Sequence, residues 1–174
     1  MPPKVLFLTQ LVLGYAAWLL CFRAYILPWL RSLGQAQAHR AIATLHSFRF
    51  FGLVFLLDGV VGPNLPRGFA LFAAYGDLAA GLLALLALLA VHIKPLFWTL
   101  VVAFNLVGAG DLLLNYYHAT RVGLPELAGQ LASAYAIPVL YVPILLITHV
   151  AAVYWLLRPL QERLATDSTA ETVA

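Results

Sequence analysis

The chain has 174 residues, of which 63% are hydrophobic and only 10% are charged, and its mean hydropathy is +0.92. Soluble domains carry roughly 25% charged residues, so this composition excludes a soluble globular protein and predicts an integral membrane protein. The net charge of +3 comes from basic residues scattered between apolar runs. We therefore expect the lipid bilayer, and no nucleic acid, as a partner.

Five apolar runs are long enough to cross a bilayer, since about 20 residues span its hydrocarbon core as a helix. The runs are continuous and do not alternate with a period of two, which favours helices over a β-barrel. The sequence therefore predicts an all-α bundle of five transmembrane helices, at residues 5–27, 41–61, 69–91, 96–117 and 134–157.

Short, turn-rich segments such as 62–68 separate most of these runs, so consecutive helices are expected to be antiparallel neighbours. The connection 119–133 is longer, and within it residues 125–131 suit either a short amphipathic surface helix or an ordinary loop. Residues 1–158 are thus expected to form one transmembrane domain. Residues 159–174 are polar and are predicted to be a disordered C-terminal tail.

The basic residues of the loops indicate the orientation of the chain. The first run is too long for a signal-peptide core and lacks a small-residue cleavage site, so we expect a retained signal anchor. An N-terminus outside and a C-terminus in the cytoplasm places more basic residues inside than outside. The cytoplasmic set is then Arg31, Arg40, Lys94, Arg158 and Arg163, and the outer set is Lys4, Arg67 and Arg121.

Three carboxylates lie within or at the edge of the apolar runs: Asp58, Asp77 and Asp111. A charge at membrane depth costs a few kcal/mol, so such residues usually face a protein interior and mark a site. Depth pairs Asp77 with Asp111 of the next, antiparallel helix. Two carboxylates in a low-dielectric site share a proton unless a cation lies between them, which predicts a proton or cation site. Asp58 is expected at an interfacial helix end.

Positions along the runs, converted into depth at about 1.5 Å per residue, predict two polar layers. One contains Asp77 and Asp111 with Tyr75, Asn115 and Tyr141. The other lies toward the opposite membrane face and comprises Arg23, His46, Arg49, Asn105 and His149. Asn105 shares a helical stripe with Asp111, so Asn105 and Tyr141 are expected to orient the carboxylates.

Structural roles compete with functional ones at these positions. Asp77 and Asp111 could make structural hydrogen bonds across the bundle, and Arg23 could extend into the headgroups. Three further histidines lie at helix ends and are most simply interfacial: His39, His92 and His118.

His46 and His149 are predicted at matched depth on different helices. This is the minimum for bis-histidine ligation of haem b, with Arg23 and Arg49 available for the propionates. A zinc or iron site needs three or more ligands, and the carboxylates lie in the other layer, so no metal site is predicted. In a third arrangement Arg49 and the two histidines hold a small anion or anionic headgroup, while the carboxylates handle protons.

The stretches 45–52, 74–78, 105–111 and 138–149 resemble a pattern in uncharacterised small polytopic bacterial membrane proteins. The resemblance covers the second to fifth runs. It implies a multi-pass protein of the bacterial inner (cytoplasmic) membrane and implies no activity. The chain contains no characterised catalytic motif, such as HExxH or GxSxG.

The sequence therefore favours an intramembrane site that binds, and in the fuller form of the hypothesis translocates, a small ligand, proton or cation. One alternative is a membrane-embedded enzyme or haem protein that uses His46 and His149. Another is a membrane scaffold without catalytic activity. Five short helices give a thin wall for a transport path, which is compatible with a homodimer.

Overall fold

The computed structural model describes residues 1–172, and the side chains of residues 1–157. No strand occurs among the described residues, which are mainly helical. Four helices in this part of the chain are long and apolar enough to cross a membrane: Pro3–Ser32, Arg67–Leu89, Lys94–Arg121 and Ile137–Leu157. These helices support the prediction of a helical membrane protein. They do not support five spans.

Two of the four helices contain a π-helical turn. The first comprises α1 (Pro3–Cys21), the π turn η1 (Phe22–Ile26) and α2 (Leu27–Ser32), and the last comprises the π turn η4 (Ile137–Tyr141) and α6 (Val142–Thr172). Each π turn ends two residues before a proline, Pro28 or Pro143. Proline has no N–H and interrupts the ordinary i→i−4 ladder, so a locally wider turn accommodates it.

The predicted span at 41–61 is not a continuous α-helix. This part of the chain is a regular helix, α3 (Gln35–Ser47), followed by a 3₁₀ segment, η2 (Phe48–Leu56). The buried residues of η2 are Arg49, Gly52 and Phe55. Their spacing of three matches the three residues per turn of a 3₁₀ helix. The tighter coil therefore keeps Arg49 on the buried face and leaves neighbouring phenylalanines exposed.

The centre of the fold is the hairpin of α4 (Arg67–Leu89) and α5 (Lys94–Arg121). One face of α4 is lined by small buried residues, among them Ala73, Ala74, Ala80 and Gly81. Small residues allow close helix approach in membranes. Accordingly α4 packs against α5 on one side and against α3 and η2 on the other.

The connection after α5 contains turns at 122–127 and then a second 3₁₀ segment, η3 (Ala128–Tyr135). It lies against the loop that follows η2, where the Gly62 amide donates to the Gln130 carbonyl at 2.7 Å. The predicted tail at 159–174 begins within α6, whose helical backbone continues to Thr172; residues 173 and 174 lie outside the described residues. The disorder of this tail stays a prediction.

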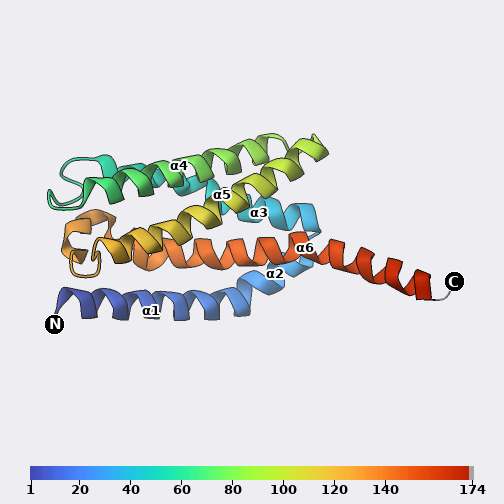
Figure 1. Ribbon diagram of the computed structural model, residues 1–174, viewed down its shortest axis with the longest axis horizontal. Coiled ribbons are helices and arrows are strands. Elements are labelled where there is room, and N and C mark those ends of the chain that lie inside the picture. The colour runs from blue at the N-terminus through green and yellow to red at the C-terminus, as the bar shows by residue number, and fades with distance from the viewer. Residues whose placement is uncertain (173–174) are drawn as a thin grey trace.

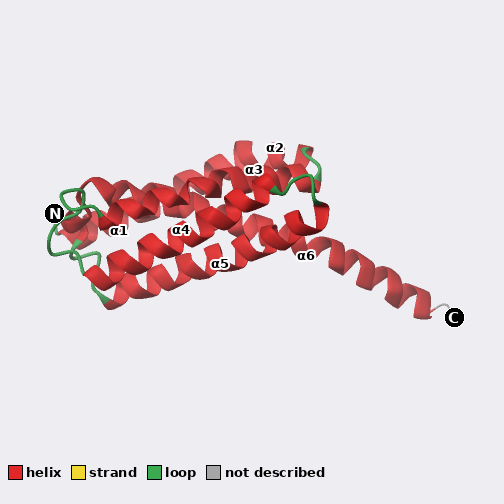
Figure 2. Ribbon diagram, turned by 90° about the horizontal axis from the view of Figure 1, so that it is seen from above, coloured by secondary structure: helices red, strands yellow, loops and turns green. Residues whose placement is uncertain are grey.

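Figure 1 shows the N-terminus, the loop before α4 and the connection after α5 at one end of the bundle, here termed the N-terminal end. The segments that join α2 to α3 and α4 to α5 lie at the opposite end. The C-terminal part of α6 extends past that opposite end, away from the other helices (Figure 2). The start of the chain and the C-terminal part of α6 therefore lie at opposite ends, while the assignment of either end to the cytoplasm stays a prediction.

Candidate functional site

Arg49 of η2 lies at the centre of a buried polar network, and none of its side chain is exposed. Its Nε donates to Asp77 Oδ1 at 2.8 Å, and its Nη2 donates to Asp111 Oδ2 at 2.6 Å. Its Nη1 donates to the Gly108 carbonyl at 3.1 Å. One guanidinium thus connects η2 to both α4 and α5, and the two carboxylates converge on it.

We call Arg49, Asp77 and Asp111 the charged cluster. It contains one permanent positive charge and two carboxylates, and no other lysine or arginine among the described residues forms an ion pair with either carboxylate. With both carboxylates ionised the cluster carries one excess negative charge. Because a buried unbalanced charge is costly, the arrangement favours uptake of one proton or one cation.

Hydrogen bonding fixes the tautomer of His149, which lies beside the charged cluster. Asn105 donates through Nδ2 to the Val101 carbonyl at 2.8 Å, so its Oδ1 accepts from His149 Nδ1 at 2.9 Å. The other ring nitrogen, Nε2, lies 3.4 Å from Arg49 Nη1, which can only donate. His149 is therefore neutral in this arrangement, with its proton on Nδ1 and its lone pair toward Arg49.

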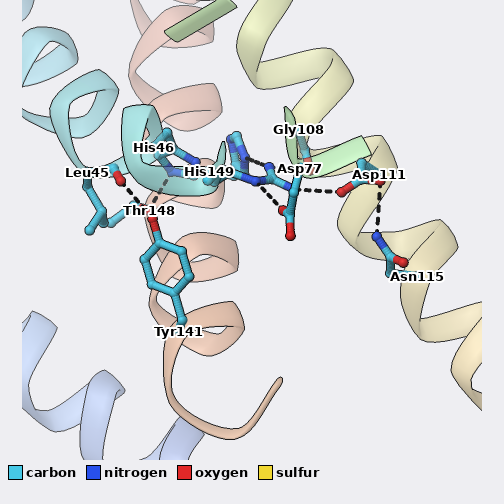
Figure 3. A network of polar contacts seen from close by, with 10 residues as sticks. Leu45, His46, Asp77, Gly108, Asp111, Asn115, Tyr141, Thr148 and His149 are labelled. Carbon is cyan, nitrogen blue, oxygen red and sulfur yellow. Dashed lines mark hydrogen bonds and ion pairs between the residues drawn. The ribbon is translucent and has the colours of Figure 1, made fainter. Parts of the chain in front are cut away.

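His46 of α3 extends the network away from the carboxylates (Figure 3). The hydroxyl of Thr148 donates to the Ile144 carbonyl at 2.8 Å, so its oxygen accepts from His46 Nε2 at 3.0 Å. The remaining nitrogen, Nδ1, is buried and has no partner among the described residues. The His46 and His149 rings are 4.0 Å apart between centroids. The histidines thus form a neutral pair on one side of the charged cluster.

Asn115 extends the network on the opposite side of the charged cluster (Figure 3). Its Nδ2 donates to Asp111 Oδ1 at 3.0 Å, whereas its Oδ1 is buried and has no partner among the described residues. Tyr141 belongs to η4, and its hydroxyl donates to the carbonyl of Leu45 in α3 at 3.0 Å. Tyr141 therefore anchors α3 to the last span and makes no hydrogen bond with the carboxylates.

Three glycines provide the space in which these polar groups meet. A Cβ on Gly52 would collide with the side chain of Asp77, and one on Gly76 would collide with the Asp111 carboxylate. A Cβ on Gly108 would lie 2.6 Å from His149 Nε2 and 2.7 Å from Arg49 Nη1. Side chains at these positions would therefore force η2, α4 and α5 apart at the network.

The structure brings most of the predicted site residues together and joins the two predicted polar layers. Arg49 contacts both carboxylates, so the prediction that it lies in a different polar layer from them is wrong. The reason is that the guanidinium has several donors on a long stem, while η2 is a 3₁₀ segment that directs Arg49 toward α4 and α5. The network unites residues of both layers: His46, Arg49, Asp77, Asn105, Asp111, Asn115 and His149.

Three predicted site residues lie outside the network: Arg23, Tyr75 and Tyr141. Arg23 is exposed, and Tyr75 has 57% of its surface exposed. Asp58 is exposed in the loop after η2. His39 is fully buried against the Trp98 ring, and both of its ring nitrogens lack a partner among the described residues. Its position at the membrane interface stays a prediction.

Sequence reasoning missed the roles of Thr148 and Gly52. Thr148 precedes His149 and shares a helix face with Tyr141, which was a usable signal. Gly52 follows Arg49 by three residues, and this spacing places both on one face of either an α-helix or a 3₁₀ helix, so it was a usable signal too.

The histidine pair does not fit haem. A porphyrin would have to lie between the two rings, yet His46 and His149 are in direct contact at 4.0 Å. Both nitrogens of His149 also have partners already, Asn105 and Arg49. Among the described residues no group of three or more His, Cys, Asp or Glu is arranged to hold a metal ion.

Residues 6–157 match a protein family described as "Domain of unknown function (DUF8737)". The chain belongs to this family. The matched residues include the whole network, from His46 to His149. No curated protein and no solved structure matches the chain significantly, and the site therefore has to be interpreted from its own chemistry.

Proposed function

We propose that this protein binds a proton or a small cation at the charged cluster and moves it across the bacterial inner membrane. The observation that carries the proposal is the single guanidinium that faces two carboxylates in a buried position. Ionisable residues within membrane bundles commonly belong to ion pathways and proton relays. One bound positive charge makes this cluster neutral, and its release restores the excess negative charge.

Unpartnered polar atoms on either side of the cluster support a path for the ion. Among the described residues, the buried side-chain nitrogens and oxygens without a partner belong to His39, His46 and Asn115. Such atoms are usually satisfied by ordered water. His39 and His46 lie seven residues apart on α3, close to two helical turns, and hence on a similar face. His46 and then His39 lie on the side of the charged cluster toward the opposite end of the bundle. Asn115 lies on the side toward the N-terminal end.

We further propose that α3 and η2 together form a fifth, interrupted membrane crossing. Thirteen residues of α3 at about 1.5 Å and nine of η2 at about 2.0 Å extend over about 37 Å. This exceeds the hydrocarbon core of about 30 Å. Interrupted helices form ion sites in many transporters, and here the interruption directly precedes Arg49. An odd number of crossings agrees with an N-terminus outside and a C-terminus in the cytoplasm.

The proposal is tested by ion movement into proteoliposomes that contain a pH-sensitive dye. Under an imposed membrane potential, the wild-type protein is expected to carry protons faster than protein-free vesicles. Asp111→Asn leaves Arg49 paired with Asp77 but removes the excess charge, so proton flux should fall by about tenfold or more. Asp77→Asn should have the same effect, and Asp58→Asn, in an exposed loop, should retain wild-type flux.

A sodium or potassium gradient, imposed in place of the membrane potential, distinguishes a proton from a metal cation as the transported ion. Folded Asp77→Asn and Asp111→Asn proteins that both retain wild-type movement of every ion tested would show that the carboxylates are structural.

A scaffold without transport is the second candidate, and the internal hydrogen bonds of Arg49 favour it. The guanidinium has partners on α4, α5 and α6, which is also what a bundle-fixing residue requires. A scaffold predicts that the wild-type protein shows no ion flux, and that the Asp111→Asn substitution changes only thermal stability.

A further inference from the structure

A cavity of about 130 Å³ lies next to the charged cluster, toward the N-terminal end of the bundle. Its walls come from α1, η2, α4, α5 and η4, together with the connection after α5. Engineered cavities of about 150 Å³ in other proteins bind benzene. The space is thus suited to a molecule with roughly the bulk of one six-membered ring.

Most of the cavity wall is apolar and aromatic, and it includes Phe7, Phe55, Phe69 and Tyr116. The polar side chains in the wall are not equivalent. The hydroxyl of Tyr116 shares a hydrogen bond with Tyr15 at 2.7 Å. The hydroxyl of Thr120 donates to the Tyr117 carbonyl at 2.7 Å. Both hydroxyls thus already make a hydrogen bond within the protein.

Asp77 and Asn115 also line the cavity. Asp77 uses Oδ1 to accept from Arg49, and Oδ2 receives no hydrogen bond from the described residues. The Asp77 side chain is 11% exposed, whereas the Asn115 Oδ1 is buried. This part of the wall therefore presents one carboxylate beside a cluster with one excess negative charge.

We propose that this cavity binds a small organic cation, namely a primary ammonium group on an apolar body of about the size of a benzene ring. The ammonium donates to Asp77, and its charge neutralises the cluster. The aromatic walls surround the body and add cation–π attraction near the charged group. The proposal rests on the proposed function, because it names the class of cation that the excess negative charge attracts.

The test measures binding of benzylammonium to the purified full-length protein in nanodiscs by isothermal titration calorimetry at neutral pH. Benzyl alcohol and benzoate are the neutral and anionic probes of the same shape. Benzylammonium is expected to bind at least about tenfold more tightly than benzyl alcohol, and benzoate should not bind, because only the ammonium complements the carboxylate. Equal binding of benzylammonium and benzyl alcohol would overturn the proposal.

Two substitutions on α5 locate the binding site. Ala119 lines the cavity, so Ala119→Phe should fill the space and abolish binding of benzylammonium. Ala103 is likewise half-buried on α5 but lies outside the cavity lining, so Ala103→Phe should bind as the wild-type protein does. Unchanged binding by Ala119→Phe would show that the probe partitions into lipid or binds elsewhere, and would overturn the proposal.

A third substitution tests the polar end. Asp77→Asn keeps the shape of the wall and removes the charge that pairs with the ammonium, so the preference for benzylammonium over benzyl alcohol should fall by about tenfold. A folded Asp77→Asn protein with an unchanged preference would exclude Asp77 and overturn the proposed pose.

The ion-flux assay separates failure of this proposal from failure of the proposed function. Proton flux by a wild-type protein that does not bind benzylammonium would overturn the cavity proposal alone. Binding of benzylammonium without movement of any ion would support the cavity proposal and overturn translocation alone.

Discussion

At the residue scale, Arg49 determines how the other polar groups are arranged. Removal of one partner from a buried ion pair typically costs about 3–5 kcal/mol, because the remaining charge stays buried and uncompensated. Arg49 has two such partners, Asp77 and Asp111. The two carboxylates thus depend on one guanidinium, and their positions cannot be understood separately.

Two glycines on α5 provide a matched test of how tightly this network is packed. A Cβ at Gly108 would lie 2.6 Å from His149 Nε2, whereas nothing lies within 4 Å of a Cβ at Gly110. Gly108→Ala is therefore expected to destabilise the protein by about 1–3 kcal/mol through overpacking. Gly110→Ala should be neutral or stabilising by up to about 1 kcal/mol, because alanine favours a helix.

Thermal unfolding of both variants in one detergent measures this difference. A Gly108→Ala protein as stable as Gly110→Ala would mean that α5 and α6 are not in close contact at the network.

At the element scale, η2 explains why the sequence predicted the residues of the site better than their geometry. Composition and run length predicted the apolar helices. Asp77, Asp111 and the histidines were found because charged and polar groups are costly within apolar runs. The two polar layers were predicted as separate because the sequence suggested a regular α-helix through residues 41–61. Nothing in the sequence marks Phe48–Leu56 as a 3₁₀ segment, whose stability depends on contacts with α4.

Two phenylalanines of η2 distinguish a 3₁₀ segment from a regular helix. In an α-helix residues four apart share a face, so Phe51 and Phe55 would be buried alike. In the structure Phe55 is 5% exposed and packs against the Phe69 ring, whereas Phe51 is 56% exposed. Phe55→Ala should therefore destabilise the protein by about 3 kcal/mol, and Phe51→Ala should change stability by about 0.5 kcal/mol or less.

Reversible unfolding in mixed micelles with increasing denaturing detergent gives both free energies of unfolding. Similar losses for the two variants would contradict the 3₁₀ arrangement and favour the regular helix.

At the scale of the whole molecule, the charged cluster requires that α3 and η2 lie alongside the four long helices. Arg49 comes from η2, whereas its partners come from α4, α5 and α6. If the cluster lies at membrane depth, the segment that carries Arg49 must enter the membrane too. The position of this one side chain is therefore an argument about topology.

The topology can be tested with single cysteines labelled by a membrane-impermeant maleimide in intact bacterial cells and in inverted membrane vesicles. In a Cys21→Ser background, cysteines at Gly34 and His92 occupy the segments at the opposite end of the bundle, whereas Asn64 occupies the loop before α4 at the N-terminal end (Figure 1). If α3 and η2 cross the membrane, Asn64→Cys is labelled in intact cells, and Gly34→Cys and His92→Cys are labelled only in inverted vesicles.

Labelling of Gly34→Cys and Asn64→Cys from the same side would show that this segment does not cross. The cluster would then lie near a membrane surface, where water screens its charges and an excess negative charge no longer requires a bound cation.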